Sequence, residues 1–297
     1  MAKAQTRSKR YARVIRALPV LTRAIADFRS RRWKIALVPT MGALHAGHFA
    51  LVRAAQRRAD RVIVSIFVNP TQFAPNEDLK TYPQTFAADL AALAKLKADL
   101  VWAPAVETMY PAGFATRVVP EGPATVGLED AFRPHFFAGV ATVVAKLLIQ
   151  CEPDIAMFGE KDFQQLRTIQ RMVKDLNFDL EIVPMPTVRE SDGLAMSSRN
   201  AYLSADERER GLSLSRALEA ARNEFAVGAR DPRALVRAAC AVLSATPELR
   251  IEYIEAVDSE SLASIARVER PVVVAIAAHV GKTRLIDNAI FAPPPAS

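Results

Sequence analysis

The stretch Ile35-Ala36-Leu37-Val38-Pro39-Thr40-Met41-Gly42-Ala43-Leu44-His45-Ala46-Gly47-His48 decides the fold class. Its first four residues are apolar, which predicts a strand buried on both faces, as in a parallel sheet covered by helices. The run ends at a proline, a glycine follows at position 42, and the pattern of residues 48–59 predicts a helix. A buried strand, a Pro/Gly turn and a helix in this order indicate an α/β domain.

The turn between this strand and this helix suits a phosphate group. The first turn of a helix presents unpaired backbone N–H groups and the positive end of the helix dipole, which together favour an anion. Gly47 lets a ligand approach the backbone, and His45 and His48 can each donate a hydrogen bond to a phosphoryl oxygen. Two alternatives stay open at this point: the histidines cap the helix for packing reasons, or they bind zinc.

The zinc alternative has little support in the sequence. Zinc-binding histidine pairs on a helix usually lie at positions i and i+4, whereas these two lie at i and i+3. The chain has only four histidines and two cysteines among its 297 residues, with no third ligand-rich cluster near the pair. We therefore favour a nucleotide over a metal.

Composition and charge are those of a globular protein that attracts anions. The chain is 51% hydrophobic and 24% charged, which is enough for one large domain or two moderate ones. Lys and Arg outnumber Asp and Glu by 39 to 32, so the surface should attract nucleotides or nucleic acid. Part of this excess lies in the first 34 residues, which we interpret as a flexible tail (1–12) and a solvated helix face.

The remaining composition bears on localisation. No apolar run approaches the roughly 18 residues of a membrane span, so we expect no membrane partner. No apolar h-region follows the Arg-rich start, which disfavours a secretory signal, while a transit peptide stays an alternative. Cys151 and Cys240 lie far apart in sequence and predict two buried thiols in a reducing cytoplasm.

The rest of the chain continues the α/β pattern to residue 186 and then changes to a different pattern. Apolar runs predict strands at 34–38, 61–68, 99–103, 154–158 and 181–183, and periodic segments predict helices at 48–59, 86–97, 139–150 and 161–176. This alternation predicts a doubly wound, Rossmann-like parallel sheet over residues 1–186. After it, helices at 204–226 and 231–244 and strands at 250–257, 271–279 and 283–287 predict a smaller α+β C-terminal domain over residues 187–297, with antiparallel strands.

Three further polar segments suit substrate binding. In the loop 192–200, Arg199 can bind a phosphate with two hydrogen bonds and Ser197 and Ser198 can add hydroxyl and N–H donors, although a turn and helix cap explain the same residues. In 158–165, Lys161 offers a cation and Asp162 an orienting group or magnesium ligand, although a charged first helical turn explains both. Segments 69–73 and 159–162 follow predicted strands, at the sheet edge where such folds bind ligands.

Taken together, these segments resemble the pantoate–β-alanine ligase family, the pantothenate synthetases of the HIGH-signature nucleotidyltransferase superfamily. The resemblance runs from about residue 14 to residue 288 and includes PTMGALHAGH (39–48), SIFVNPTQF (65–73), FGEKDFQQL (158–166) and DGLAMSSRNAYL (192–203), in order. The Met-Ser-Ser-Arg loop is similar to the KMSKS loop of class I aminoacyl-tRNA synthetases. One such match arises easily by chance, whereas four in order do not.

The resemblance implies an ATP- and Mg²⁺-dependent ligase that joins (R)-pantoate to β-alanine through a pantoyl adenylate, giving pantothenate, AMP and pyrophosphate. It also implies a homodimer. By this resemblance Gln72 contacts pantoate and β-alanine, Gln165 contacts pantoate, and Asn69 and Arg133 belong to the substrate pocket. The implied catalytic residues are His45, His48, Lys161, Ser197, Ser198 and Arg199, with His48 as proton donor. The implied ATP-binding residues are Pro39, Thr40, Met41, Gly42, Ala43, Leu44, His45, Ala46, Gly47, His48, Gly159, Glu160, Lys161, Asp162, Val188, Met196, Ser197, Ser198 and Arg199.

The chemistry of adenylate formation requires less of these residues than the resemblance implies. The protein must hold two anions in line and compensate charge on phosphorus, so we interpret the histidines, the lysine, the serines and the arginine chiefly as stabilisers of developing phosphate charge. Literal proton donation by His48 is not required, because pyrophosphate leaves as a magnesium complex. We expect Mg²⁺ to be held through the ATP phosphates, with Asp89 or Asp162 as candidate protein ligands.

The chain departs from the family pattern at two places. Where the family commonly has Arg-Pro-Gly-His-Phe-x-Gly-Val, residues 133–140 read RPHFFAGV, so the histidine stands one place early, as His135. Where the family often has Tyr-Pro-Arg-Thr, residues 82–85 read YPQT, so Gln84 replaces a cation near the rim of the site.

Two rival hypotheses stay open. A nucleotidyltransferase that keeps the adenylyl group in its product would use the same phosphate residues, although the Gln72 and Gln165 segments and the second domain favour the ligase. A basic nucleic-acid-binding module lacks support, because aromatic residues make up only 7% of the chain and form no basic, aromatic-rich stripe. We expect small-molecule partners and no nucleic acid.

Overall fold

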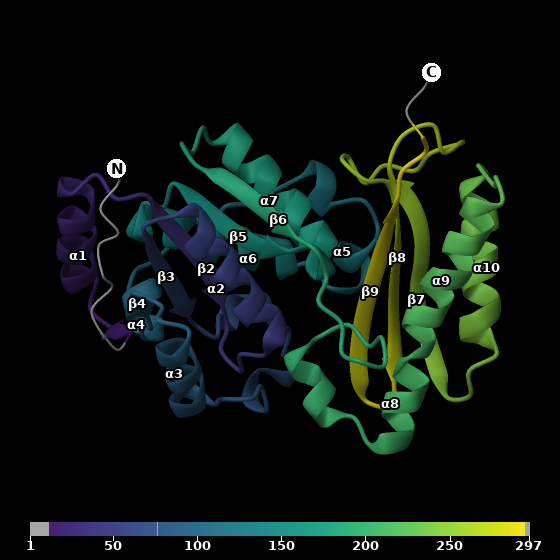
Figure 1. Cartoon of the computed structure of the whole chain (residues 1–297), viewed down its shortest axis with the longest axis horizontal. Helices are drawn as coiled ribbons and strands as arrows, with labels where there is room; N and C mark the ends of the chain where they lie inside the picture. The colour runs from purple at the N-terminus through teal and green to yellow at the C-terminus, as the bar shows by residue number, and fades with distance from the viewer. Residues whose placement is uncertain (1–11, 76, 295–297) are drawn as a thin grey trace, which may run out of the picture. The chain divides into compact units, whose positions relative to one another are not determined.

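The computed structural model describes residues 12–75 and 77–294, and the chain divides into two compact units (Figure 1). The first unit comprises the chain up to Val119 together with His135–Phe158 and Met172–Met185. The second comprises Pro120–Pro134, Gly159–Arg171 and the chain from Pro186 onward. The second unit therefore contains the predicted C-terminal domain, 187–297, and also two short segments from earlier in the chain. Of the predicted tail 1–12, all but Ala12 lies outside the described residues.

A six-stranded parallel sheet with helices between its strands forms the first unit, as the sequence predicts. The strand order is β1-β4-β3-β2-β5-β6. The strands are β1 (Arg13–Ile15), β2 (Ile35–Thr40), β3 (Arg61–Ile66), β4 (Leu100–Trp102), β5 (Ile155–Gly159) and β6 (Glu181–Met185). The helices are α1 (Leu18–Ser30), α2 (Ala46–Arg58), α3 (Phe86–Lys95), α4 (Val106–Met109) and α6 (Phe136–Cys151), with the 3₁₀ turns η1 (Pro70–Gln72) and η2 (Asp78–Lys80); α7 (Phe163–Asp175) belongs partly to each unit.

Strand β2 lies at the point where the strand order reverses. It pairs with β3 on one side and with β5 on the other, while β4 and β6 lie further out in opposite directions. Open α/β sheets bind ligands beyond the carboxyl ends of their strands at such a reversal. The loop that follows β2 carries the His45–His48 motif, so the topology places this motif where a nucleotide is expected.

Strand β2 contacts both α2 and α6. Ala36 and Val38 are fully buried in a cluster that includes Val52 and Ala55 of α2. On neighbouring β4, the indole N–H of the fully buried Trp102 donates to Gln150 of α6 at 3.1 Å. This double coverage explains why the strands read as continuous apolar runs.

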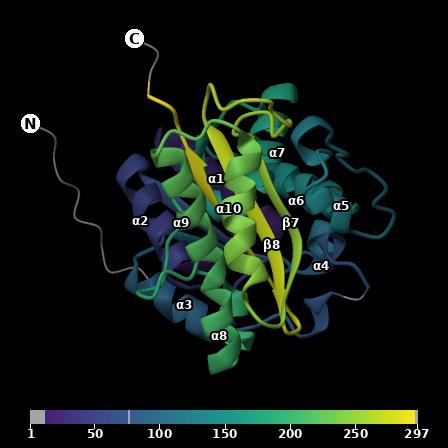
Figure 2. The ribbon, with the colours of Figure 1, turned by 90° about the vertical axis from the view of Figure 1, so that its right-hand side faces the viewer.

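An antiparallel sheet with helices on one face forms the main part of the second unit. The sheet has the order β7-β8-β9, antiparallel as predicted, and α9 and α10 lie side by side over it (Figure 2). Apolar residues of both helices and of β8 share one buried cluster. The elements are β7 (Leu249–Asp258), β8 (Val272–Val280), β9 (Thr283–Phe291), α5 (Glu129–Phe132), α8 (Ala205–Gly211), α9 (Ser213–Ala226), α10 (Pro232–Ser244), and the 3₁₀ turns η3 (Gly122–Ala124), η4 (Glu160–Asp162) and η5 (Ser198–Tyr202).

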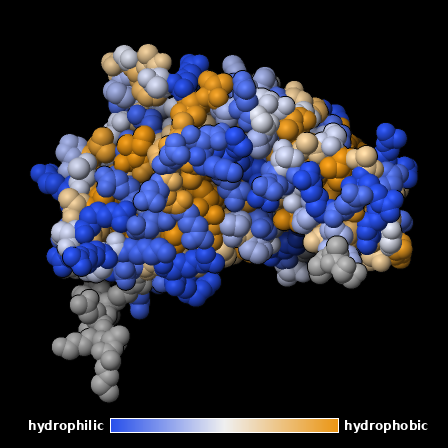
Figure 3. Space-filling model, turned by 90° about the horizontal axis from the view of Figure 1, so that it is seen from above, coloured by the Kyte–Doolittle hydropathy of each residue, from blue (hydrophilic) through white to orange (hydrophobic). Residues whose placement is uncertain are grey.

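No helix within residues 12–75 and 77–294 combines the length and the apolar character that a membrane span needs. Figure 3 shows hydrophilic and hydrophobic residues interspersed over the face that it views.

Cys151 is buried, and burial together with the neighbouring Glu152 carboxylate raises the pKa of its thiol. Cys240 is only half-buried, so the prediction of two buried thiols is wrong for this residue: it lies near the edge of the α10 packing face.

Candidate active site

The loop between β2 and α2 is held in an unusual backbone conformation by a buried carboxylate. Gly42 and Ala43 both have positive φ, 88° and 49°, a region that L-residues such as alanine adopt only where contacts enforce it. Asp89, which is 3% exposed, accepts the N–H of Ala43 at 3.0 Å and of Leu44 at 2.9 Å, and Thr85 Oγ1 donates to it at 3.0 Å. Both oxygens of this candidate magnesium ligand therefore fix the predicted nucleotide loop.

The two histidines of the motif cap helix α2. His45 is the N-cap residue; its Nδ1 accepts the N–H of Gly47 at 3.2 Å, and Nδ1 of His48 accepts the N–H of His45 at 3.3 Å. The ring centroids lie 4.1 Å apart. A neutral imidazole whose Nδ1 accepts a backbone N–H carries its proton on Nε2, so this geometry assigns Nε2 as the donor in both rings. Capping and phosphate binding, which the sequence offers as alternatives, are thus compatible: Nδ1 caps the helix and Nε2–H is a donor.

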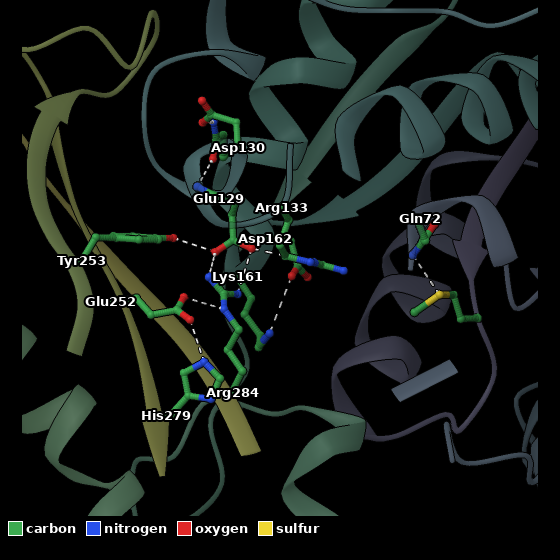
Figure 4. A network of polar contacts seen from close by, with 12 residues as sticks. Gln72, Glu129, Asp130, Arg133, Lys161, Asp162, Glu252, Tyr253, His279 and Arg284 are labelled. Atoms are coloured by element: carbon green, nitrogen blue, oxygen red, sulfur yellow. Dashed lines mark hydrogen bonds and ion pairs between the residues drawn. The ribbon is translucent and has the colours of Figure 1, made fainter. Parts of the chain in front are cut away.

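A second polar group follows β3. Asn69, 1% exposed, donates to Oε1 of Gln72 at 3.1 Å and to the carbonyl of Gly139 at 3.2 Å, and accepts the hydroxyl of Tyr110 at 2.8 Å. Gln72, 8% exposed, in turn donates from Nε2 to Met41 Sδ at 3.0 Å (Figure 4). The first unit therefore brings the predicted Met41, Asn69 and Gln72 together.

Close backbone packing sets the position of this group. Helix α6 approaches the η1 turn so closely that a Cβ on Gly139 would lie 2.5 Å from Thr71 O and 2.9 Å from Gln72 N. Only glycine fits there without displacing backbone. Gly139 is thus required for the close packing of α6 on η1, which the sequence interpretation missed although this glycine stands in the Arg-Pro-x-x-Phe-x-Gly-Val segment.

A pocket of about 230 Å³ opens beside the β2–α2 loop in the first unit. Met41 and Gly42 form one wall, and Gln84, which replaces a cation of the family pattern, lines another part. The remaining lining is mostly apolar and comes from the carboxyl ends of β3 and β4 and the start of α3. His135, the displaced histidine, precedes α6, and its buried Nε2 has no hydrogen-bond partner among the described residues.

The second unit holds the other predicted phosphate residues. Lys161 lies in η4, directly after β5, with a side chain 19% exposed and its Nζ 3.6 Å from Asp162 Oδ1. Gln165 follows in the first turn of α7 and is half-buried. Strand β9 packs against both η4 and η5, the turn that contains Ser198 and Arg199.

The Met196–Arg199 loop leaves a short hairpin. Met196 N–H donates to Val188 O at 2.9 Å, and Arg189 pairs with Ala195 as an antiparallel bridge. Ser197 is the N-cap of η5, and its hydroxyl accepts the N–H of Arg199 at 3.3 Å. The cap interpretation of this loop is therefore correct for Ser197, and the loop keeps a defined shape.

A buried ionic network ties residues 120–134 to the C-terminal sheet (Figure 4). Arg284 of β9 donates to both oxygens of Glu129 at 2.7 and 2.8 Å and to Glu252 at 2.8 Å. Burial opposes charge on Arg284, but these carboxylates outweigh it and raise its pKa. Burial likewise opposes charge on Glu252, yet Arg284 and His279 hold the pKa of Glu252 below its ordinary value. Arg133, the predicted pocket residue, joins the network 3.7 Å from Glu129.

Within the described residues, no group of three or more His, Cys, Asp or Glu side chains could hold a metal ion. The predicted phosphate and substrate residues fall into two sets, one in each unit. His45, His48, Asn69 and Gln72 belong to the first unit, while Arg133, Lys161, Gln165 and Ser197–Arg199 belong to the second.

Known proteins match this chain over almost its full length. A model of the pantoate-beta-alanine ligase family matches residues 13–290. A protein named pantothenate synthetase 2 from Bradyrhizobium diazoefficiens is 54% identical over 93% of this chain and 97% of its own length, and a pantothenate synthetase from Nitrobacter winogradskyi is 55% identical with the same coverage.

Solved structures agree with this match. The crystal structure of pantothenate synthetase from Thermus thermophilus superposes with a TM-score of 0.89 at 45% identity, covering 93% of this chain and 98% of that one. A pantoate-beta-alanine ligase from Francisella tularensis, crystallised with a β,γ ATP compound and β-alanine, has a TM-score of 0.76 at 33% identity and covers 94% of this chain and 97% of that one.

Proposed function

The chain belongs to the pantoate–β-alanine ligase family, and from this premise we propose how its residues perform the reaction. The reaction is the ATP-dependent condensation of pantoate with β-alanine. An unactivated carboxylate does not acylate an amine at neutral pH, so the pantoate carboxylate first attacks the α-phosphorus of ATP, giving pantoyl adenylate and pyrophosphate. The β-alanine amine then attacks the acyl carbon and releases AMP.

The histidine pair carries this proposal. Because Nδ1 of His45 and Nδ1 of His48 accept backbone N–H groups, both rings are neutral and present Nε2–H as a donor. A neutral donor stabilises negative charge that develops on a phosphoryl oxygen without giving up its proton. We assign both histidines to charge stabilisation and not to proton donation.

The remaining residues divide by chemistry. Lys161 supplies a compact cation, Arg199 a planar guanidinium, and Ser197 and Ser198 hydroxyl donors, all of which are groups that bind phosphate. Backbone N–H groups of the β2–α2 loop, held in shape by Asp89, add neutral donors. Gln72 and Gln165 offer amides to pantoate, with Asn69 fixing the Gln72 side chain and Arg133 adding positive charge.

Magnesium suits the oxygen donors on offer. Asp162 has a half-exposed carboxylate, 50% accessible, and hard oxygen ligands are those that Mg²⁺ prefers. We propose that the ion is held chiefly by the ATP phosphates, where it offsets the charge of the departing pyrophosphate. We propose that the chain acts as a homodimer, as its resemblance to the family implies, and in the cytoplasm, where thiols such as those of Cys151 and Cys240 stay reduced.

The dependence of adenylate formation on pH separates the two roles of His48. Under charge stabilisation by neutral rings, we expect the wild-type rate of pantoate-dependent pyrophosphate exchange not to decline through a kinetic pKa of about 6.5, the ordinary value for histidine, as the pH rises. His48→Gln keeps an amide N–H donor but not the position of Nε2–H, so it should lower the rate by about 10²-fold at every pH. A wild-type rate that declines with that pKa, in a profile that His48→Gln abolishes, would show that His48 donates a proton; His279→Gln serves as the histidine control.

A further inference from the structure

Two consecutive residues of β9 hold the two phosphate-binding segments of the second unit. Asn288 is 7% exposed, and its amide donates to the carbonyls of both Glu160 and Lys161 at 2.9 Å. These bonds fix the backbone of the η4 turn from which the Lys161 side chain departs. The contact spans 127 positions of sequence, so it is a tertiary constraint and not part of the turn itself.

Asp287 performs the matching task for the other segment. Its carboxylate, 3% exposed, accepts both terminal nitrogens of Arg189 at 2.6 and 2.9 Å, and Arg189 also donates to Gly193 O at 3.1 Å. Arg189 pairs with Ala195 in the hairpin that leads directly into Met196–Arg199. A bidentate pair of this kind fixes orientation as well as distance.

The arrangement follows from strand geometry. Successive side chains leave a strand on opposite faces, so adjacent residues can reach two different segments. The Asn288 N–H also donates to Asp287 Oδ1 at 2.8 Å, which orients the carboxylate toward Arg189. One short piece of rigid sheet thus sets both the η4 turn and the base of the Ser197–Arg199 loop.

We propose that Asp287 and Asn288 are positioning residues for adenylate formation: together they fix the spacing between Lys161 and Arg199. Neither side chain touches the nucleotide; each acts through the segment that it holds. This inference rests on the proposed roles of Lys161 and Arg199 at the ATP phosphates. Preorganised charges stabilise a transition state only when their geometry is set beforehand, and a shift of about 1 Å can reduce a rate by about 10²-fold.

Double-mutant cycles on pantoate-dependent pyrophosphate exchange test the proposal. We expect Asn288→Ala to reduce exchange by about 10²-fold in the wild type but by no more than about twofold in a Lys161→Ala background, where nothing is left to position. Asp287→Asn should show the same loss of effect in an Arg199→Ala background. Each should keep its full effect in the opposite background. Asn288→Ser, which retains one donor, should recover part of the rate.

A matched control separates positioning from folding. Asp258 is a buried carboxylate of the same sheet, 2% exposed and paired with Arg270 at 2.7 Å, but its bonds go to residues 260–261 and not to either loop. Asp258→Asn should lower the melting temperature while leaving exchange within about twofold of wild type. If Asp287→Asn does not fold, Arg189→Lys keeps the charge, loses the bidentate geometry and replaces it in the cycle.

The outcomes are distinct. If Asn288→Ala and Asp287→Asn reduce exchange equally in every background, the two residues are merely structural and the positioning proposal is overturned. If Lys161→Ala and Arg199→Ala themselves leave exchange unchanged, it is the proposed function of these two residues that is wrong.

Discussion

We expect Lys161→Ala to reduce pantoate-dependent pyrophosphate exchange by about 10³-fold, the upper range for loss of one preorganised charge-stabilising group. The side chain is only 19% exposed, and Asp162, 3.6 Å away, is its ion-pair partner. In such a partly desolvated place a cation stabilises charge on phosphorus more strongly than in water. Because that charge develops in the transition state, the rate constant should fall more than the affinity for ATP.

Two further variants serve as a conservative replacement and a control for this prediction. Lys161→Arg keeps the charge but not its compact shape, so it should recover only part of the rate. Lys174→Ala removes an exposed cation from the last turn of α7 and should leave exchange unchanged. Equal rates of exchange in Lys161→Ala and Lys174→Ala would show that Lys161 takes no part in adenylate formation.

Gly139→Ala is expected to have the second largest effect. Its new Cβ would lie 2.5 Å from Thr71 O, so the η1 turn must move and Gln72 with it. We expect kcat/KM for pantoate to fall by about 10²-fold and stability to fall by about 1–3 kcal/mol from overpacking. The sign of the change in stability is informative, because alanine in place of an unhindered helical glycine stabilises a helix by about 1 kcal/mol.

Steady-state kinetics with varied pantoate, together with thermal unfolding, measure both effects. Ile149→Ala, at an exposed position of the same helix (64%), controls for changes in α6 itself and should leave pantoate kinetics unaltered. A Gly139→Ala protein that is more stable than wild type and fully active would show that the close approach of α6 to η1 does not set the position of Gln72.

The sequence predicts most of the sheet because burial on both faces leaves a strong local signal. The runs at 34–38, 61–68 and 154–158 correspond to β2, β3 and β5, the three adjacent strands that precede the candidate segments. The sequence indicates a helix face in the Arg-rich start of the chain but predicts neither the bounds of α1 nor strand β1, because their few buried residues, such as Ile15 and Leu21, stand among several arginines. Strand β4 is equally short, but all three of its residues are apolar, whereas β1 begins with an arginine.

The candidate site also has parts that leave a local signal in the sequence and parts that do not. Motif residues such as His45, Lys161 and Arg199 could be identified because their chemistry is visible locally. The contacts that hold them could not, since Asp89, which the sequence suggests only as a candidate magnesium ligand, reaches a loop 45 positions away and Asn288 reaches Lys161 across 127. A buried polar side chain in a strand, as at Asp287 and Asn288, is the signal that was available, because such groups need specific partners.

The central claim is that the protein activates pantoate as an acyl adenylate before β-alanine reacts. It is tested most directly by following labelled pyrophosphate into ATP with Mg²⁺ and pantoate present and β-alanine absent, and then measuring AMP after β-alanine is added. We expect exchange that requires pantoate, and AMP released in step with pantothenate only after the amine is supplied. Exchange that proceeds without pantoate, or an adenylyl group that stays in the final product, would contradict this account.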